Sequence, residues 1–76
     1  MNDKQLTMWT VYDHPEDFPD AFIAREWLVT SSGAVASGTV IKSRSLARIR
    51  HELASYGLTC LTRSPEDDPV IVETWI

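Results

Sequence analysis

The hydrophobic pattern of this chain predicts strands over most of its length. β-Branched and aromatic side chains dominate several short runs that are bounded by turn residues, a composition typical of strands. These runs cover residues 6–12, 22–30, 35–42, 58–62 and 70–76. Two serines and a glycine at 31–33 separate the second run from the third, and so short a connection predicts a hairpin between them.

One segment has the spacing of an amphipathic helix. Ser43 or Ser45 can cap the free N–H groups of its first turn, and Gly57 suits the left-handed position that ends many helices. We therefore expect a helix over residues 44–56, give or take two residues at each end. Its apolar stripe recurs every three or four residues and consists of Leu46, Ile49, Leu53 and Tyr56.

The order of these elements, β-β-β-α-β-β, predicts an α+β fold. We expect a small antiparallel sheet of four to five strands with one α-helix packed on one face. The chain has 76 residues, so residues 1–76 are expected to form a single domain. The helical stripe is expected to be buried against Val70 and Val72.

The three tryptophans of the chain are expected to mark a binding surface. A single helix covers one face of a sheet, and side chains alternate between the two faces along each strand. The helix-free face is therefore expected to expose apolar rings, which are common in protein interfaces, and a cross-strand pair between Arg25 and Glu73 would lie among them. The interface residues predicted for this face are Trp9, Arg25, Trp27, Glu73 and Trp75.

Two other interpretations of the aromatic rings remain open. The long loops could fold over the helix-free face and make the rings part of the core. The rings could also form a base-stacking platform for single-stranded nucleic acid. That platform needs basic residues between the rings, and only Arg25 is placed for it. The formal net charge of −4 also disfavours binding to nucleic acid or an anionic membrane.

Two proline-rich loops at residues 13–20 and 63–69 hold seven of the eleven acidic residues. They meet at one end of the sheet if the first and last strands are antiparallel. Their spacing matches no defined metal motif, so we expect solvated loops without a metal ion or a cofactor.

Four of the seven basic residues fall within nine positions. This basic patch is expected to be either a solvated helix face or a docking surface for an acidic partner. Such a partner is a nucleic acid or the acidic loops of another copy. The patch consists of Lys42, Arg44, Arg48 and Arg50.

No catalytic signature occurs in the sequence, and we expect no catalytic residues. His14 and His51 have no zinc-ligand spacing, and Cys60 is expected to be a small buried hydrophobic residue. A single cysteine, no signal-like apolar run and no stretch of about 20 apolar residues predict a cytoplasmic protein outside the membrane.

Residues 9–22 (WTVYDHPEDFPDAF) and 63–76 (RSPEDDPVIVETWI) resemble the two ends of a family of short uncharacterised bacterial proteins of unknown function. This resemblance implies a bacterial, cytoplasmic source, and it implies no activity or site. At the level of the fold, the chain also resembles small β-β-β-α-β proteins that serve as toxin–antitoxin partners. That second likeness is an analogy, and fold does not determine function.

Together these observations predict a non-enzymatic interaction module. It is expected to form a homodimer or to bind another protein through the tryptophan-rich face. The alternative is a regulatory, antitoxin-like protein that associates with nucleic acid through the basic patch.

Overall fold

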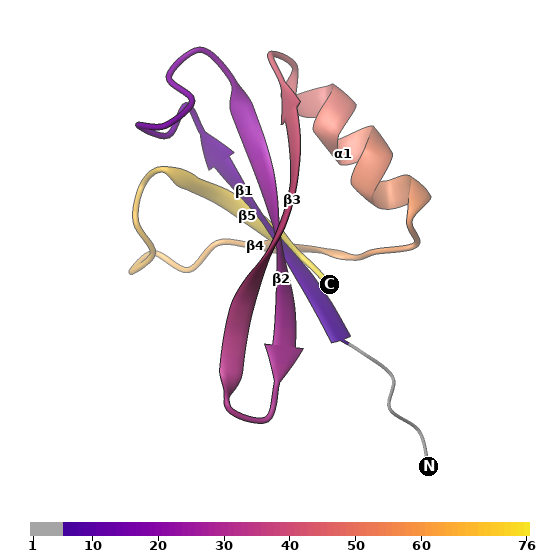
Figure 1. Cartoon of the computed structure of the whole chain (residues 1–76). Helices are drawn as coiled ribbons and strands as arrows, with labels where there is room; N and C mark the ends of the chain where they lie inside the picture. The colour runs from indigo at the N-terminus through magenta and orange to yellow at the C-terminus, as the bar shows by residue number, and fades with distance from the viewer. Residues whose placement is uncertain (1–5) are drawn as a thin grey trace.

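In a computed structural model, which describes residues 6–76, the chain forms one antiparallel sheet with a single helix on one face (Figure 1). The strand order across the sheet is β3-β2-β1-β5-β4. This architecture confirms the predicted α+β class and the order β-β-β-α-β-β. The elements are β1 (Leu6–Asp13), β2 (Phe22–Thr30), β3 (Gly33–Ser43), α1 (Leu46–Ser55), β4 (Cys60–Thr62) and β5 (Ile71–Trp75).

The hairpin of β2 and β3 is longer than the sequence indicates. The predicted third strand begins at residue 35, whereas β3 begins at Gly33 and pairs with β2 from the turn onward. The register shifts between Arg25 and Trp27, opposite a stretch that contains Gly38 with φ +92°. Such a bulge takes up extra residues without ending the strand, so the glycine bends β3 rather than interrupting it.

The helix has the predicted termini. Ser45 is the N-cap, and its hydroxyl accepts a hydrogen bond from the backbone N–H of Arg48 at 3.3 Å. At the other end Tyr56 is the C-cap and Gly57 has φ +80°, a conformation that a side chain disfavours. The caps match the expected residues because they depend on local backbone chemistry alone.

The core lies between α1 and the face of the sheet that it covers, the helix-side face. Ile49 and Leu53 are fully buried there, as the stripe predicts, whereas Leu46 is half-buried and Tyr56 is 51% exposed. Val72 packs against this core, but Val70 does not belong to it, so that part of the prediction is wrong. The buried cluster consists of Trp9, Val11, Ala24, Ile49, Leu53 and Trp75.

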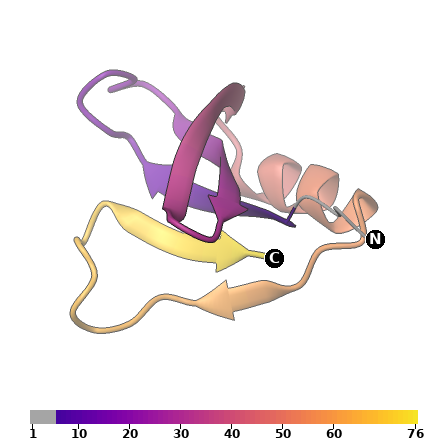
Figure 2. The ribbon, with the colours of Figure 1, turned by 60° about the horizontal axis from the view of Figure 1, so that its bottom comes forward.

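The two proline-rich loops lie on the side of the sheet away from α1 (Figures 1 and 2). The two loops meet because β1 and β5 pair antiparallel, which is the condition that the sequence set for their meeting. The backbone N–H of Asp13 donates to the carbonyl of Val70 at 2.7 Å and joins the end of β1 to the start of β5. This arrangement brings both acidic loops to one end of the helix-free face.

Candidate functional site

The structure separates the three tryptophans between the two faces of the sheet. Trp9 and Trp75 are directly opposite each other on β1 and β5, and they are only 3% and 7% exposed within the helix-side core. The expectation that they lie on the helix-free face is therefore wrong. Trp27 does lie on that face, since Met8 is its partner on β1 and Trp9 points to the other side.

The width of the sheet explains this error. α1 contacts β2 and β3, and one helix with its side chains is about 10 Å wide. Five strands spaced about 4.8 Å apart are much wider, so α1 meets β1 and β5 through long side chains. The large rings of Trp9 and Trp75 extend the core across these two strands, and Tyr56 from the end of α1 packs on Trp9 with 5.9 Å between ring centroids.

Glu73 also lies on the helix-side face, and the predicted Arg25–Glu73 pair does not form. Glu73 is 5% exposed and binds Arg50 of the helix through two hydrogen bonds of 2.9 and 3.0 Å. The indole Nε1 of Trp75 donates to the same carboxylate at 2.9 Å. Burial raises the pKa of Glu73, but the hydrogen bonds from Arg50 and Trp75 outweigh it, so the pKa lies below its ordinary value.

Replacing Glu73 with glutamine is expected to reduce stability most at neutral pH. Because the pKa of Glu73 is lower in the folded state, the carboxylate contributes fully above its ordinary pKa and loses this contribution as the pH falls through the folded value. We expect Glu73→Gln to lower the free energy of unfolding by about 1–3 kcal/mol at pH ~7. Arg50 is half-exposed, so the cost should stay below that of breaking a fully buried pair.

Urea denaturation of both proteins between about pH 7 and pH 3 measures this difference. It should shrink toward acid pH as Glu73 of the wild type becomes protonated. Glu66→Gln, which alters an exposed acid, is the control and should change stability little. A Glu73→Gln effect of the same size at every pH would contradict the electrostatic explanation.

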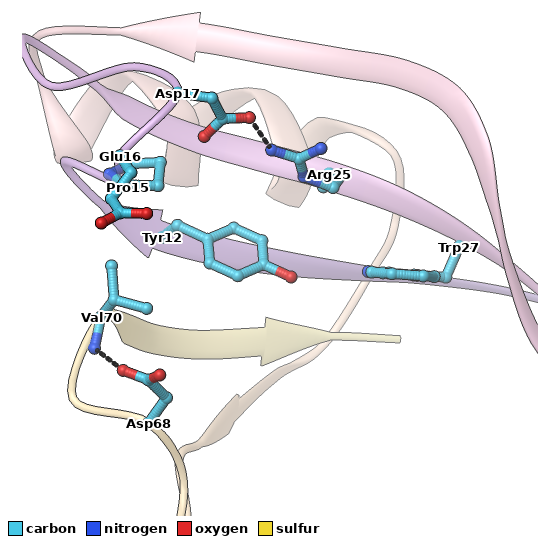
Figure 3. A pocket seen from close by; sticks show the side chains of 8 residues that line it. All are labelled: Tyr12, Pro15, Glu16, Asp17, Arg25, Trp27, Asp68 and Val70. Carbon is cyan, nitrogen blue, oxygen red and sulfur yellow. Dashed lines mark hydrogen bonds and ion pairs between the residues drawn. The ribbon is translucent and has the colours of Figure 1, made fainter.

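A groove opens on the helix-free face, between the sheet and the two proline-rich loops (Figure 3). Its volume is about 770 Å³, which is in the range of small-molecule and cofactor pockets. We call it the sheet groove. It is lined by Tyr12, Pro15, Glu16, Asp17, Arg25, Trp27, Asp68 and Val70.

The first proline-rich loop covers part of the helix-free face and forms one wall of the groove. Asp17 accepts a hydrogen bond from the guanidinium of Arg25 at 2.8 Å, and this bond holds the pKa of the Asp17 carboxyl below its ordinary value. Phe18 lies under the ammonium of Lys42, 5.4 Å from its ring centroid. Ile23 on the same face is fully buried. The loop thus covers the end of this face near Ile23, while Trp27 lines the groove that remains open beside it.

The floor of the groove is aromatic and has an unused hydrogen-bond donor. Figure 3 shows the edge of the Trp27 indole turned toward the hydroxyl end of Tyr12. Nε1 of Trp27 is buried, yet it has no hydrogen-bond acceptor in the described part of the chain. A buried donor without an acceptor is costly, and in native proteins most such groups are hydrogen-bonded to protein or ordered water.

Two of the predicted interface residues therefore line the groove, Arg25 and Trp27. Sequence reasoning did not assign Tyr12 to the site, although it places Tyr12 at the end of the first strand beside an acidic loop. It identified the acidic loops but not the individual carboxylates that reach the groove. Only the antiparallel register of β1, β2 and β5 brings these residues together.

The structure divides the predicted basic patch. Arg50 is bound to Glu73 on the helix-side face, and Lys42 lies over Phe18 on the other side of the sheet. Arg44 and Arg48 are exposed, and neither has an ion-pair partner within residues 6–76. The four residues thus do not form one continuous cationic surface.

Cys60 is exposed, in contrast to the buried position expected from the sequence. It lies on the edge strand β4, so only one side of it packs against the sheet. Partial burial of the sulfur and the nearby Glu73 carboxylate raise the pKa of its thiol. A thiol with a raised pKa is protonated at neutral pH and is a poor nucleophile.

The part of the chain that the structure describes contains no cluster of three or more metal-ligating side chains. It also contains no helix of the length and hydropathy needed to cross a membrane.

No protein-family model, curated protein or solved structure matches this chain. The resemblance of its two ends to short bacterial proteins stays a prediction.

Proposed function

We propose that this protein is a non-enzymatic interaction module that binds a polypeptide through the sheet groove. The observation that carries this proposal is a groove of about 770 Å³ on the helix-free face, whose lining brings two aromatic rings and an arginine together. Tryptophan, tyrosine and arginine dominate the energetics of protein interfaces, and the groove presents Trp27, Tyr12 and Arg25 together.

The groove fits a polypeptide segment better than another folded surface. The groove is concave because the two loops rise on one side of it (Figure 3). Two folded proteins usually meet through larger and flatter surfaces, which bury about 800 Å² per partner. Aromatic-lined grooves commonly take extended, proline-rich segments. The bound segment belongs to another protein or to a second copy of this chain.

A reducing bacterial cytoplasm is the location that we propose for the module. This location is supported by Cys60, which is the single cysteine of the chain and is exposed and free. Exposed thiols persist in compartments where glutathione and thioredoxin keep them reduced. The resemblance to short bacterial proteins agrees with it.

Selection of random peptides displayed on phage, with the full-length protein as target, tests the proposed function. Peptides enriched on the wild type should bind Trp27→Ala about 30-fold more weakly, since a hot-spot tryptophan contributes roughly 2 kcal/mol or more. Leu61→Ala is the control because Leu61 pairs with Thr74 on the helix-free face but does not line the groove. Circular dichroism shows whether each variant is folded, and Trp27→Phe replaces Trp27→Ala if the latter is not.

Enriched peptides whose affinity is unaffected by Trp27→Ala or Trp27→Phe would overturn the proposal, as would a failure to enrich any peptide.

A further inference from the structure

The sheet groove has an excess of negative charge. Glu16, Asp17 and Asp68 line it, and Arg25 is the one basic residue among the described residues of its lining. Asp17 is already paired with Arg25, but neither Glu16 nor Asp68 has a cationic partner in the described chain. Two carboxylates therefore stand unneutralised beside an aromatic floor.

Arg25 shows how this surface holds a cation. Its guanidinium lies 5.6 Å from the ring centroid of Tyr12, within the range of a cation–π contact, and 2.8 Å from the Asp17 carboxylate. Arg25 is 30% exposed and Asp17 is 55% exposed, so the pair is weakly held in water. A ring face and a carboxylate on this floor thus already accommodate a guanidinium, and a ligand can rearrange them at little cost.

The aromatic floor adds an apolar surface to the groove. Tyr12 and Trp27 both line it, so an extended segment can place its cation near Glu16 and Asp68 and its apolar side chains on these rings. Proline-rich extended segments dock on aromatic-lined grooves in this way.

We propose that the sheet groove binds an extended, cationic peptide segment of a partner protein, with an arginine or lysine side chain between Glu16 and Asp68 and the rest of the segment along the rings of Tyr12 and Trp27. This inference rests on the proposed function, because it names the class of polypeptide that occupies the same groove. Charge complementarity selects the segment, and the aromatic floor distinguishes specific binding from simple attraction to an acidic protein.

A second copy of the chain fits this description poorly. Arg48 lies within α1, and Arg44 lies just before its N-cap Ser45. Lys42 is in the extended strand β3, but it is paired with Ile23 and its ammonium lies over the Phe18 ring. Arg63 is in a loop, and its guanidinium already donates to two backbone carbonyls. The described residues therefore favour a partner protein of different sequence over a second copy.

A synthetic peptide of alternating proline and arginine, with a proline–glutamate peptide as its counterpart, tests the inference on the full-length protein. The readout is the indole N–H signal of Trp27 in a ¹H–¹⁵N spectrum, assigned with Trp27→Phe. We expect the arginine peptide to shift this signal and the glutamate peptide to leave it unchanged. Affinity should fall roughly tenfold between about 50 mM and 500 mM salt, as expected for partly exposed charges.

A matched pair of variants separates the groove from the overall charge. Glu16→Gln with Asp68→Asn removes two charges from the groove and should weaken binding about fivefold or more. The asparagine retains an oxygen for the bond to the Val70 backbone. Asp20→Asn with Glu66→Gln removes two charges from the same loops outside the groove and should weaken binding less than twofold.

The outcomes distinguish this inference from the proposed function. If the displayed peptides depend on Trp27 but are not cationic, the groove is a binding site and the cationic segment is wrong. If both double variants weaken binding equally, the attraction is nonspecific and the inference is wrong. Binding of the arginine peptide that leaves the Trp27 signal unmoved would also overturn it, and so would concentration-dependent dimerisation that the arginine peptide dissociates, because a second copy would then occupy the groove.

Discussion

Trp75→Ala is expected to destabilise the protein by about 3–5 kcal/mol, the usual cost of removing a buried tryptophan. The ring is only 7% exposed within the core, and its Nε1 donates to Glu73 at 2.9 Å. The substitution leaves a cavity and removes one of the hydrogen bonds that hold the Glu73 carboxylate. A domain of 76 residues has a total stability of roughly 4–11 kcal/mol, so this loss would unfold much of the population.

Urea denaturation followed by far-ultraviolet circular dichroism measures this loss. Trp27→Ala is the matched control, since it makes the same chemical change on a half-buried residue of the helix-free face and should cost clearly less. If Trp75→Ala were as stable as the wild type, the ring of Trp75 would not be part of the core. It would then lie on an exposed interaction surface, as the sequence predicts.

Leu53→Ala is the other substitution with a large expected effect, about 2–5 kcal/mol. Leu53 is fully buried at the centre of the helical stripe, and α1 is the one helix in the described chain. Deleting its side chain leaves a cavity between α1 and the sheet that the ten-residue helix can close only in part.

The control for Leu53→Ala makes the same change at Leu61, which is 44% exposed on β4. Thermal or urea denaturation should show a cost within about 0.5 kcal/mol there, as is typical of surface sites. A Leu53→Ala cost below about 0.5 kcal/mol would mean that the stripe does not face the core.

The pattern of residues was sufficient to predict the elements and the class of the fold. β2 has the predicted bounds, residues 22–30, and the Ser45 cap and Gly57 define the helix within two residues. These features depend on neighbours in the sequence, through capping, turn geometry and side-chain periodicity. The sequence also predicted that the two acidic loops meet at one end of the sheet, because this requires only that β1 and β5 be antiparallel.

The assignment of faces in β5 could not be obtained in this way. Alternation shows that Glu73 and Trp75 share one face and Thr74 lies on the other, but it does not say which face meets the helix. A charged residue beside a tryptophan is typical of a half-exposed surface, so the pattern favoured the wrong face. The alternation of residues in β5 carries no information about Arg50, which lies 23 positions earlier in the chain. Arg50 hydrogen-bonds to Glu73 and so makes the burial of its carboxylate possible.

The sequence by itself thus determined the helix, the strands and the acidic loops, since each of these depends on short-range chemistry. The tertiary structure alone decided which rings are core and which residues form the groove. Pairing with β1 places Trp75 opposite Trp9 in the core, and the β1–β2 register leaves Trp27 on the helix-free face with Tyr12 and Arg25. Register and long-range ion pairs follow from the packing of the whole chain, and no local pattern encodes them.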